Sequence, residues 1–105
     1  MSTIGTFTGG KDGSIVGKII TLTINSHATF VPVEKDGPKA PDYRLTLASV
    51  DYIDVEVGAA WIKTSRNERD YLSVKIDDPS FPNPIYASLV ESNERPGEYL
   101  LRWSR

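Results

Sequence analysis

Apolar and polar residues alternate along most of this chain with a period of two. This period is typical of half-buried β-strands, and the spacing that would indicate helices is nearly absent. Glycine, proline, asparagine and aspartate interrupt the pattern about every 8–12 residues, as turns between short strands do. The pattern therefore predicts an all-β domain of about seven to nine strands. The expected strands are residues 3–8, 14–24, 27–34, 43–48, 52–57, 59–64, 71–77, 85–91 and 98–104.

Many short strands joined by turns predict a small antiparallel barrel, either OB-like or built as a half-open sandwich. The 105 residues are enough for one domain, and we expect residues 1–105 to form it. Prolines exclude residues 35–42 and 78–84 from regular strands, so both segments are expected to be loops. Gly17 interrupts a β-branched run and predicts a bulge or bend there.

The amino-acid composition excludes some classes of function and argues against others. The chain has no cysteine, which excludes disulfides and thiolate metal sites, and its net charge of −2 argues against avid binding to duplex nucleic acid. Residues 1–57 carry five Lys/Arg against seven Asp/Glu, whereas residues 58–105 carry seven of each. We see no signal peptide and no apolar run near the roughly 18 residues of a membrane span, and expect a cytoplasmic protein without a membrane partner.

The sequence offers few groups for catalysis. His27 is the single histidine, and acid–base or nucleophilic chemistry needs partners around it. The pairs Asp54/Glu56 and Asp77/Asp78 are typical of solvated strand faces and turns. Gly9, Gly10 and Gly13 lack the Lys-Ser/Thr ending of a phosphate loop. We therefore expect no enzyme, no metal and no cofactor.

The hairpin predicted over residues 59–77 holds the best binding candidates, and its register decides their role. If its loop has an even number of residues, Trp61 lies opposite Val74 in the core, and the nearby basic residues only keep the surface soluble. If the number is odd, Ile62 joins Val74, and Trp61, Lys63, Tyr71, Ser73 and Lys75 share an exposed face. Aromatic rings beside basic groups are typical of single-stranded nucleic-acid platforms. We favour the buried tryptophan, because small domains tend to bury such rings. The candidate binding residues are Trp61, Lys63, Arg66, Arg69, Tyr71 and Lys75.

Two further aromatic residues stand out. Phe81 lies in a loop stiffened by three prolines and could anchor a partner, although folding back as a lid on the barrel end is the more common arrangement. Trp103 lies on one side of the last strand with Tyr99 and Leu101, either in the core or at an exposed edge that recruits another chain. We expect it in the core.

Several segments follow one another in a characteristic order: IGTF (4–7), TLTIN (21–25), FVPVEK (30–35), KAPDYR (39–44), GAAW (58–61), KTSR (63–66), YLSVKIDDPSFPNPIYA (71–87) and WSR (103–105). Together they resemble a bacterial family known as domain of unknown function 736. Two places differ from the family pattern. Ile62 stands where a lysine is usual, and residues 49–57 differ from the usual glycine-containing turn or are longer than it. The resemblance implies a small cytoplasmic protein often encoded on plasmids and conjugative elements, and it brings no established activity or binding residues.

These observations favour a non-catalytic interaction module, accessory to a bacterial mobile genetic element. It would dock to a protein partner or to itself through an edge strand or the Phe81 loop. The alternative is a weak single-stranded nucleic-acid-binding protein. Exposure of Trp61 separates the two: a buried ring supports the interaction module, and an exposed ring supports the nucleic-acid binder.

Overall fold

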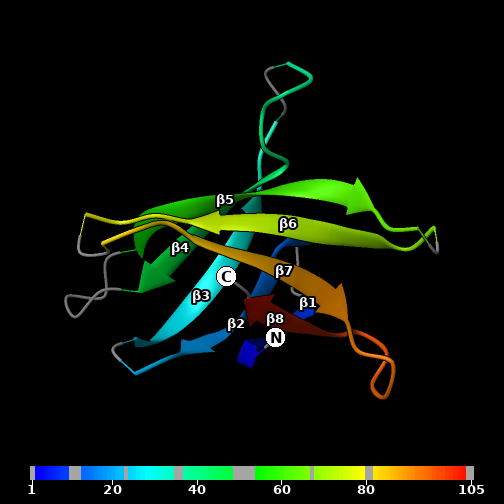
Figure 1. The fold of residues 1–105 in the computed structure, drawn as a ribbon, viewed down its shortest axis with the longest axis horizontal. Helices are drawn as coiled ribbons and strands as arrows, with labels where there is room; N and C mark the ends of the chain where they lie inside the picture. Colours follow the sequence, from blue (N-terminus) through cyan, green and yellow to red (C-terminus); the bar gives the residue numbers. More distant parts are fainter. Residues whose placement is uncertain are drawn as a thin grey trace.

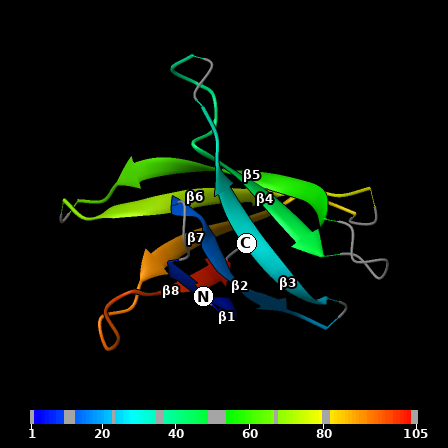
Figure 2. The same cartoon turned by 180° about the vertical axis from the view of Figure 1, so that it is seen from behind.

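The chain folds into a closed antiparallel barrel of eight strands, in which each strand pairs with its neighbours in sequence and the last pairs with the first (Figures 1 and 2). The computed structural model describes residues 2–9, 13–22, 24–34, 37–48, 54–66, 68–79 and 82–103. Within these ranges there is no α-helix, so the all-β barrel prediction is confirmed. The strands are β1 (Ser2–Gly9), β2 (Ile15–Ile20), β3 (Asn25–Pro32), β4 (Tyr43–Ala48), β5 (Asp54–Thr64), β6 (Asp70–Ile76), β7 (Ile85–Glu91) and β8 (Glu98–Trp103).

Barrel closure settles the architecture that the sequence left open. An OB-fold is a five-stranded Greek-key barrel and a half-open sandwich leaves edges, whereas here β1 pairs along its length with β8, from Ser2 opposite Trp103 to Thr8 opposite Glu98. The connectivity is therefore up-and-down, because each strand pairs antiparallel with the next one in sequence. Eight strands enclose an interior just wide enough to be filled by side chains.

Two glycines behave differently from their predicted roles. Gly58 does not separate two strands, because it stays in the β5 ladder between Leu45 and Ile76, next to a one-residue shift in the β4–β5 register. A Cβ at Gly58 would lie 2.2 Å from the backbone oxygen of Lys75. Gly17 also keeps a regular register rather than forming a bulge, and it leaves room for Phe7. Both positions need glycine because two backbones approach closely.

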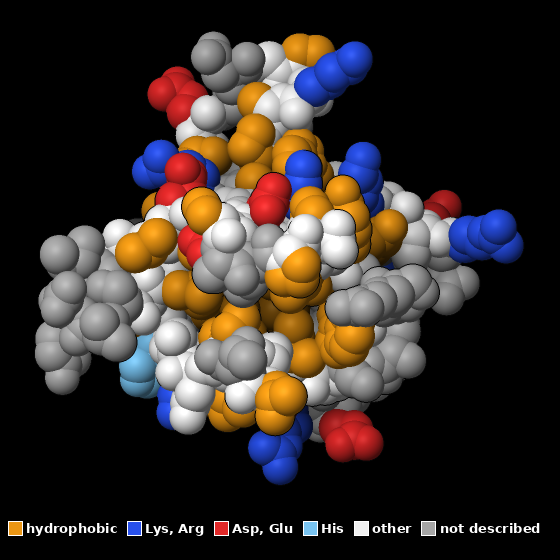
Figure 3. Space-filling view, turned by 60° about the vertical axis from the view of Figure 1, so that its left-hand side comes forward, with side chains coloured by type: hydrophobic (Ala, Val, Ile, Leu, Met, Phe, Trp, Pro, Cys, Tyr) orange, Lys and Arg blue, Asp and Glu red, His pale blue; other side chains and the backbone are white. Residues whose placement is uncertain are grey.

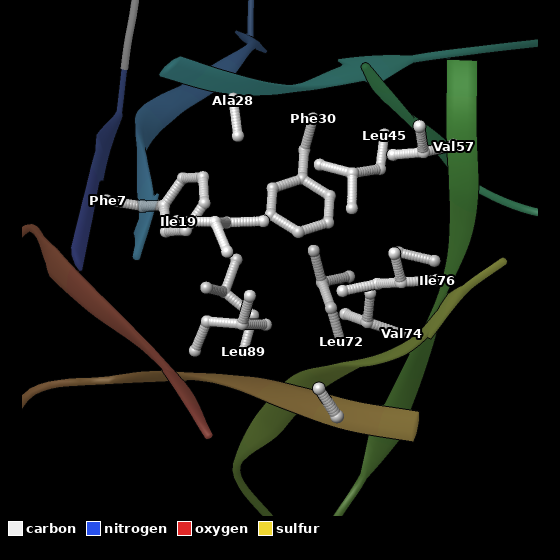
Figure 4. Packing of buried hydrophobic residues seen from close by; sticks show 13 residues of the cluster. Phe7, Ile19, Ala28, Phe30, Leu45, Val57, Leu72, Val74, Ile76 and Leu89 are labelled. Carbon is white, nitrogen blue, oxygen red and sulfur yellow. The ribbon is translucent and has the colours of Figure 1, made fainter. Parts of the chain in front are cut away.

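Inward-facing side chains from all eight strands meet in one core (Figure 4). At its centre the rings of Phe7 and Phe30 lie 5.2 Å apart at 57°, a tilted arrangement favourable for aromatic pairs. Trp103 is partly buried and packs against this core, as predicted. The buried residues are Phe7, Ile19, Ala28, Phe30, Leu45, Val57, Ala60, Leu72, Val74, Ile76, Ala87, Leu89 and Leu101.

The connections between strands lie at the two ends of the barrel. Strands β1, β3, β5 and β7 end, and β2, β4, β6 and β8 begin, at one end of the barrel, here called the hairpin end; the segment around residues 37–42 projects from the barrel there (Figures 1 and 2). Figure 3 brings forward the side on which β4 and β6 end, where hydrophobic side chains surround a hollow. No helix in the described ranges could cross a bilayer.

Candidate functional site

The β5–β6 hairpin has the odd-numbered register. Residues 65–69 connect the strands, Trp61 lies opposite Ser73, and Ile62 lies opposite Leu72. Trp61 therefore faces outward, and the expectation that it is a core residue is wrong. The inward position beside it belongs to Ala60, which is completely buried. Loop length sets the register of a hairpin, and a shift of one residue would exchange its two faces.

Trp61 lies against the segment that precedes β4. Its indole Nε1 donates a hydrogen bond to the backbone oxygen of Lys39 at 3.1 Å, and the ring remains partly exposed. The next amide, that of Ile62, donates to Oδ2 of Asp42 at 2.9 Å. These two bonds hold residues 39–42 along β5. They satisfy the polar edge of the indole and fix the position of the ring without burying it in the core.

Rings and lysines alternate on the outer surface of β5, β6 and β7. Lys63 lies opposite Tyr71, and Lys75 lies opposite Tyr86, whose side chain is 60% exposed. None of the outward positions on these three strands, between residues 59 and 63, 71 and 75, or 86 and 90, carries a carboxylate. We call this surface the aromatic–basic face; it comprises Ala59, Trp61, Lys63, Tyr71, Ser73, Lys75, Tyr86, Ser88 and Val90.

Tyr86 is the aromatic residue of this face that the sequence reasoning missed. The alternation over residues 85–91 contained the signal, since Ala87 and Leu89 point inward and are buried. Tyr86 then had to point outward, and the pairing of β6 with β7 places it beside Lys75. Only the strand pairing, which the sequence did not reveal, connects this ring with the others.

The two arginines of the hairpin loop have different positions. Arg69 donates from Nη1 to Oδ1 of Asn93 at 2.8 Å, so it connects the tip of β5–β6 to the tip of β7–β8. Arg66 is exposed in the loop. Both arginines were candidate binding residues, and the hydrogen bond to Asn93 instead gives Arg69 a structural role between the two hairpin tips. Phe81, the remaining binding candidate, lies outside the described residues.

The carboxylates near the two lysines of the face do not pair with them, although Glu56 and Asp77 line one small pocket together with Lys75. Glu56 pairs with Arg44 at 3.3 Å, and Asp70 accepts a hydrogen bond from Oγ1 of Thr64 at 2.9 Å. Asp77 is exposed where β6 ends, beyond Lys75 in the outward row. Lys63 and Lys75 are exposed and form no ion pair with a described carboxylate. An anion that approached the middle of the face would therefore meet positive charge.

The residues considered for catalysis do not gather into one site that includes the histidine. Glu56 and Asp77 line one small pocket, and His27 is not among its lining residues. His27 is exposed on β3 opposite Lys18, and Asp54 lies exposed on β5. Among the described residues, no three His, Asp or Glu side chains are close enough together to hold a metal ion. The described part of the chain therefore offers the aromatic–basic face as its best-developed surface for binding.

Comparison with known proteins places the chain in a family. The family described as "protein of unknown function (DUF736)" matches residues 3–105, essentially the whole chain. The chain belongs to this family, which confirms the resemblance drawn from its motifs. Neither a curated protein nor a solved structure matches it.

Proposed function

We propose that this protein is a non-catalytic binding module that holds single-stranded nucleic acid on the aromatic–basic face. The observation that carries the proposal is the register of β5 and β6, which turns Trp61 outward beside Lys63 and Tyr71. Had the register been even, Trp61 and Lys63 would both turn inward, and the outer face of β5 would carry neither the ring nor the lysine. The outward ring thus favours the nucleic-acid binder over the interaction module.

The face supplies the two interactions that sequence-independent binding of a single strand needs. Bases stack on aromatic rings, each contact being worth about 1–3 kcal/mol, and lysines attract the phosphates. Trp61, Tyr71 and Tyr86 provide rings on three adjacent strands, and each tyrosine lies opposite a lysine. A strand of nucleic acid crossing β5, β6 and β7 would meet these groups in turn.

The charge of the chain limits the affinity. A net charge of −2 and two lysines on the face favour few phosphate contacts, so stacking provides most of the binding free energy. Duplex DNA hides its bases from stacking and should bind more weakly than a single strand. The setting implied by the family resemblance, the bacterial cytoplasm and DNA transfer or maintenance by a mobile element, is one in which single strands occur.

The other expected function, docking to a protein through an edge strand, has less support. Each of the eight described strands pairs on both sides, and β8, which carries Trp103, pairs with both β1 and β7. Closure therefore removes the free edge on which that mode depends. Self-association or docking through the Phe81 loop stays a prediction.

The test is a titration of a fluorescently labelled pyrimidine oligonucleotide, followed by anisotropy at two salt concentrations. We expect saturable binding that weakens with salt, and weaker binding of the duplex form of the same oligonucleotide. Trp61→Ala should reduce the affinity by about 1–3 kcal/mol. Ile20→Ala, which removes an exposed side chain far from the face, serves as the control. Absence of binding at low salt, or equal binding by Trp61→Ala and the wild type, would contradict the proposal.

A further inference from the structure

Ile62 faces the barrel interior and is nevertheless 50% exposed. Its partner across the hairpin, Leu72, is 7% exposed, and the next inward residues on these strands, Ala60 and Val74, are almost completely buried. The interior is therefore filled along most of β5 and β6 and unfilled at Ile62. Since an inward position of a closed barrel is normally covered by the opposite wall, this exposure marks an opening at the hairpin end.

The opening arises where two hairpins diverge. The β6–β7 ladder ends with Leu72 opposite Leu89, and beyond it the tips of β5–β6 and β7–β8 separate (Figure 1). The hydrogen bond from Arg69 to Asn93 joins the tips again farther out. Between these two links lies a pocket of about 810 Å³, here called the hairpin-end cup. This volume is in the range of sites that hold small organic ligands, and the mouths of β-barrels are a common place for them.

The inner wall of the cup is apolar and aromatic. Tyr43 and Tyr99 are partly exposed there, and Tyr99 lies opposite Phe7, so the buried Phe7–Phe30 pair closes the barrel directly beneath. The residues that form this wall are Ile15, Tyr43, Ile62, Leu72, Leu89 and Tyr99. The wall thus combines aliphatic side chains with two phenol groups that can each form a hydrogen bond.

Charges around the cup nearly cancel. Arg69 and Arg102 line it together with Asp70, Glu91 and Glu94, a formal sum of −1. Two of these acids already accept hydrogen bonds: Asp70 from Thr64, and Glu91 from the amide of Gly97. A rim with this balance offers an organic anion no net attraction, and it has no excess of acid that would select a strong cation.

We propose that the hairpin-end cup is a second binding site, for a small uncharged molecule with a flat apolar body and one polar group. The apolar body would cover Ile62, whose burial the fold leaves incomplete, and the polar group would bond to a tyrosine hydroxyl. Tyr71 and Val90 of the aromatic–basic face also line the cup, so the two sites adjoin along β6 and β7. Ile62 belongs to the cup alone and Trp61 to the face alone, so substitutions at these two positions test the sites separately.

The probe is N-phenylnaphthylamine, a neutral dye that fluoresces in apolar surroundings, with the anionic dye anilinonaphthalene sulfonate as its charged counterpart. We expect saturable binding of one neutral dye per chain, tighter than that of the anionic dye. Dye binding should shift the backbone amide signals of Ile62, Leu72 and Tyr99 in a two-dimensional NMR spectrum. It should leave those of Tyr86 and Ser88 unchanged.

Two variants locate the dye. Ile62→Trp fills the cup and should abolish saturable binding, and Ile62→Asn, which makes its wall polar, should weaken it. Ile20→Trp introduces the same ring at an isoleucine of similar exposure, 56%, at the other end of the barrel, and should bind as the wild type does. Thermal unfolding of each variant checks that the fold persists.

The proposal is overturned if the wild type binds no neutral dye, or if Ile62→Trp and Ile20→Trp affect binding equally. It is also overturned if the anionic dye binds more tightly. Oligonucleotide binding by Ile62→Trp should equal that of the wild type, whereas Trp61→Ala should bind the dye normally. Failure of one site is in this way distinguished from failure of the other.

Discussion

The two faces of the β5–β6 hairpin are built from neighbouring residues and have opposite properties. On the inner face Ala60, Val74 and Ile76 are at most 2% exposed, and they contribute through packing alone. On the outer face, Trp61 directly follows Ala60 in sequence and Lys75 lies between Val74 and Ile76, yet both side chains contact solvent. The difference shows that the alternation of a strand divides stability and binding between adjacent positions. Substitutions one residue apart should therefore have different consequences.

The largest contrast is expected from a carboxylate placed on either face. Val74→Asp would bury an unpaired charge in the barrel and should lower the free energy of unfolding by at least about 3 kcal/mol. Ser73→Asp places the same group outward and should leave stability within about 0.5 kcal/mol. It should weaken oligonucleotide binding, because it opposes the phosphates. Urea denaturation and the anisotropy titration measure both effects, and equal destabilisation by the two variants would contradict the register.

A smaller loss of stability is expected at the close approach of β5 and β6. A Cβ at Gly58 would lie 2.2 Å from the backbone oxygen of Lys75, so Gly58→Ala forces the strands apart and should cost about 1–3 kcal/mol. Gly9→Ala is the matched control, since nothing lies within 4 Å of its Cβ. Thermal or urea unfolding compares the two. The close approach would be refuted if both variants unfolded alike.

The lysines of the outer face should change the salt dependence of binding and leave stability unaffected. Each phosphate contact on a single strand contributes about 0.7 to the slope of log affinity against log salt, so Lys63→Ala and Lys75→Ala should each lower the slope by about that amount. Lys18, exposed on β2 away from the face, provides the control. A salt series of oligonucleotide titrations measures the slopes. If Lys18→Ala lowers the slope as much, binding is spread over the surface.

The smallest effect is expected in the loop that sets the register. Glu68 has a φ of 59°, in the left-handed region that side chains disfavour. Glu68→Gly should therefore stabilise the fold by a few tenths to about 1 kcal/mol. Glu94→Gly, at an exposed position in the opposite hairpin loop without such a φ, should bring no gain. Differential scanning calorimetry would detect the difference, and a loss of stability in Glu68→Gly would count against the loop geometry.

The sequence was sufficient to predict the fold class and much of the core. Period-two alternation predicted a strand over residues 71–77, in which Leu72, Val74 and Ile76 share one side, and all three are buried. The break placed at Gly58 was wrong because glycine can also mark a close approach inside a continuous strand. Local pattern does not distinguish these two uses, since the difference depends on a neighbouring backbone.

The candidate residues of the β5–β6 hairpin were predictable from the sequence, but the side of the hairpin on which they lie was not. The outward face depends on the number of loop residues, and Lys63, Thr64, Ser65 and Arg66 are all polar, so no hydrophobic signal marks where β5 ends. The exposure of Ile62 depends on where β6 and β7 separate. Both features are set by pairing between strands distant in sequence, which alternation within one strand does not report.

The most direct test of the aromatic–basic face uses the two tryptophans separately. Trp103→Phe leaves Trp61 as the single emitter, and Trp61→Phe leaves Trp103, which packs against the core. Titration with a single-stranded oligonucleotide at low salt should quench the fluorescence of Trp103→Phe in a saturable, salt-sensitive way and leave that of Trp61→Phe almost unchanged. Quenching of equal size in both variants, or none in Trp103→Phe, would contradict binding through the outer face of β5–β6.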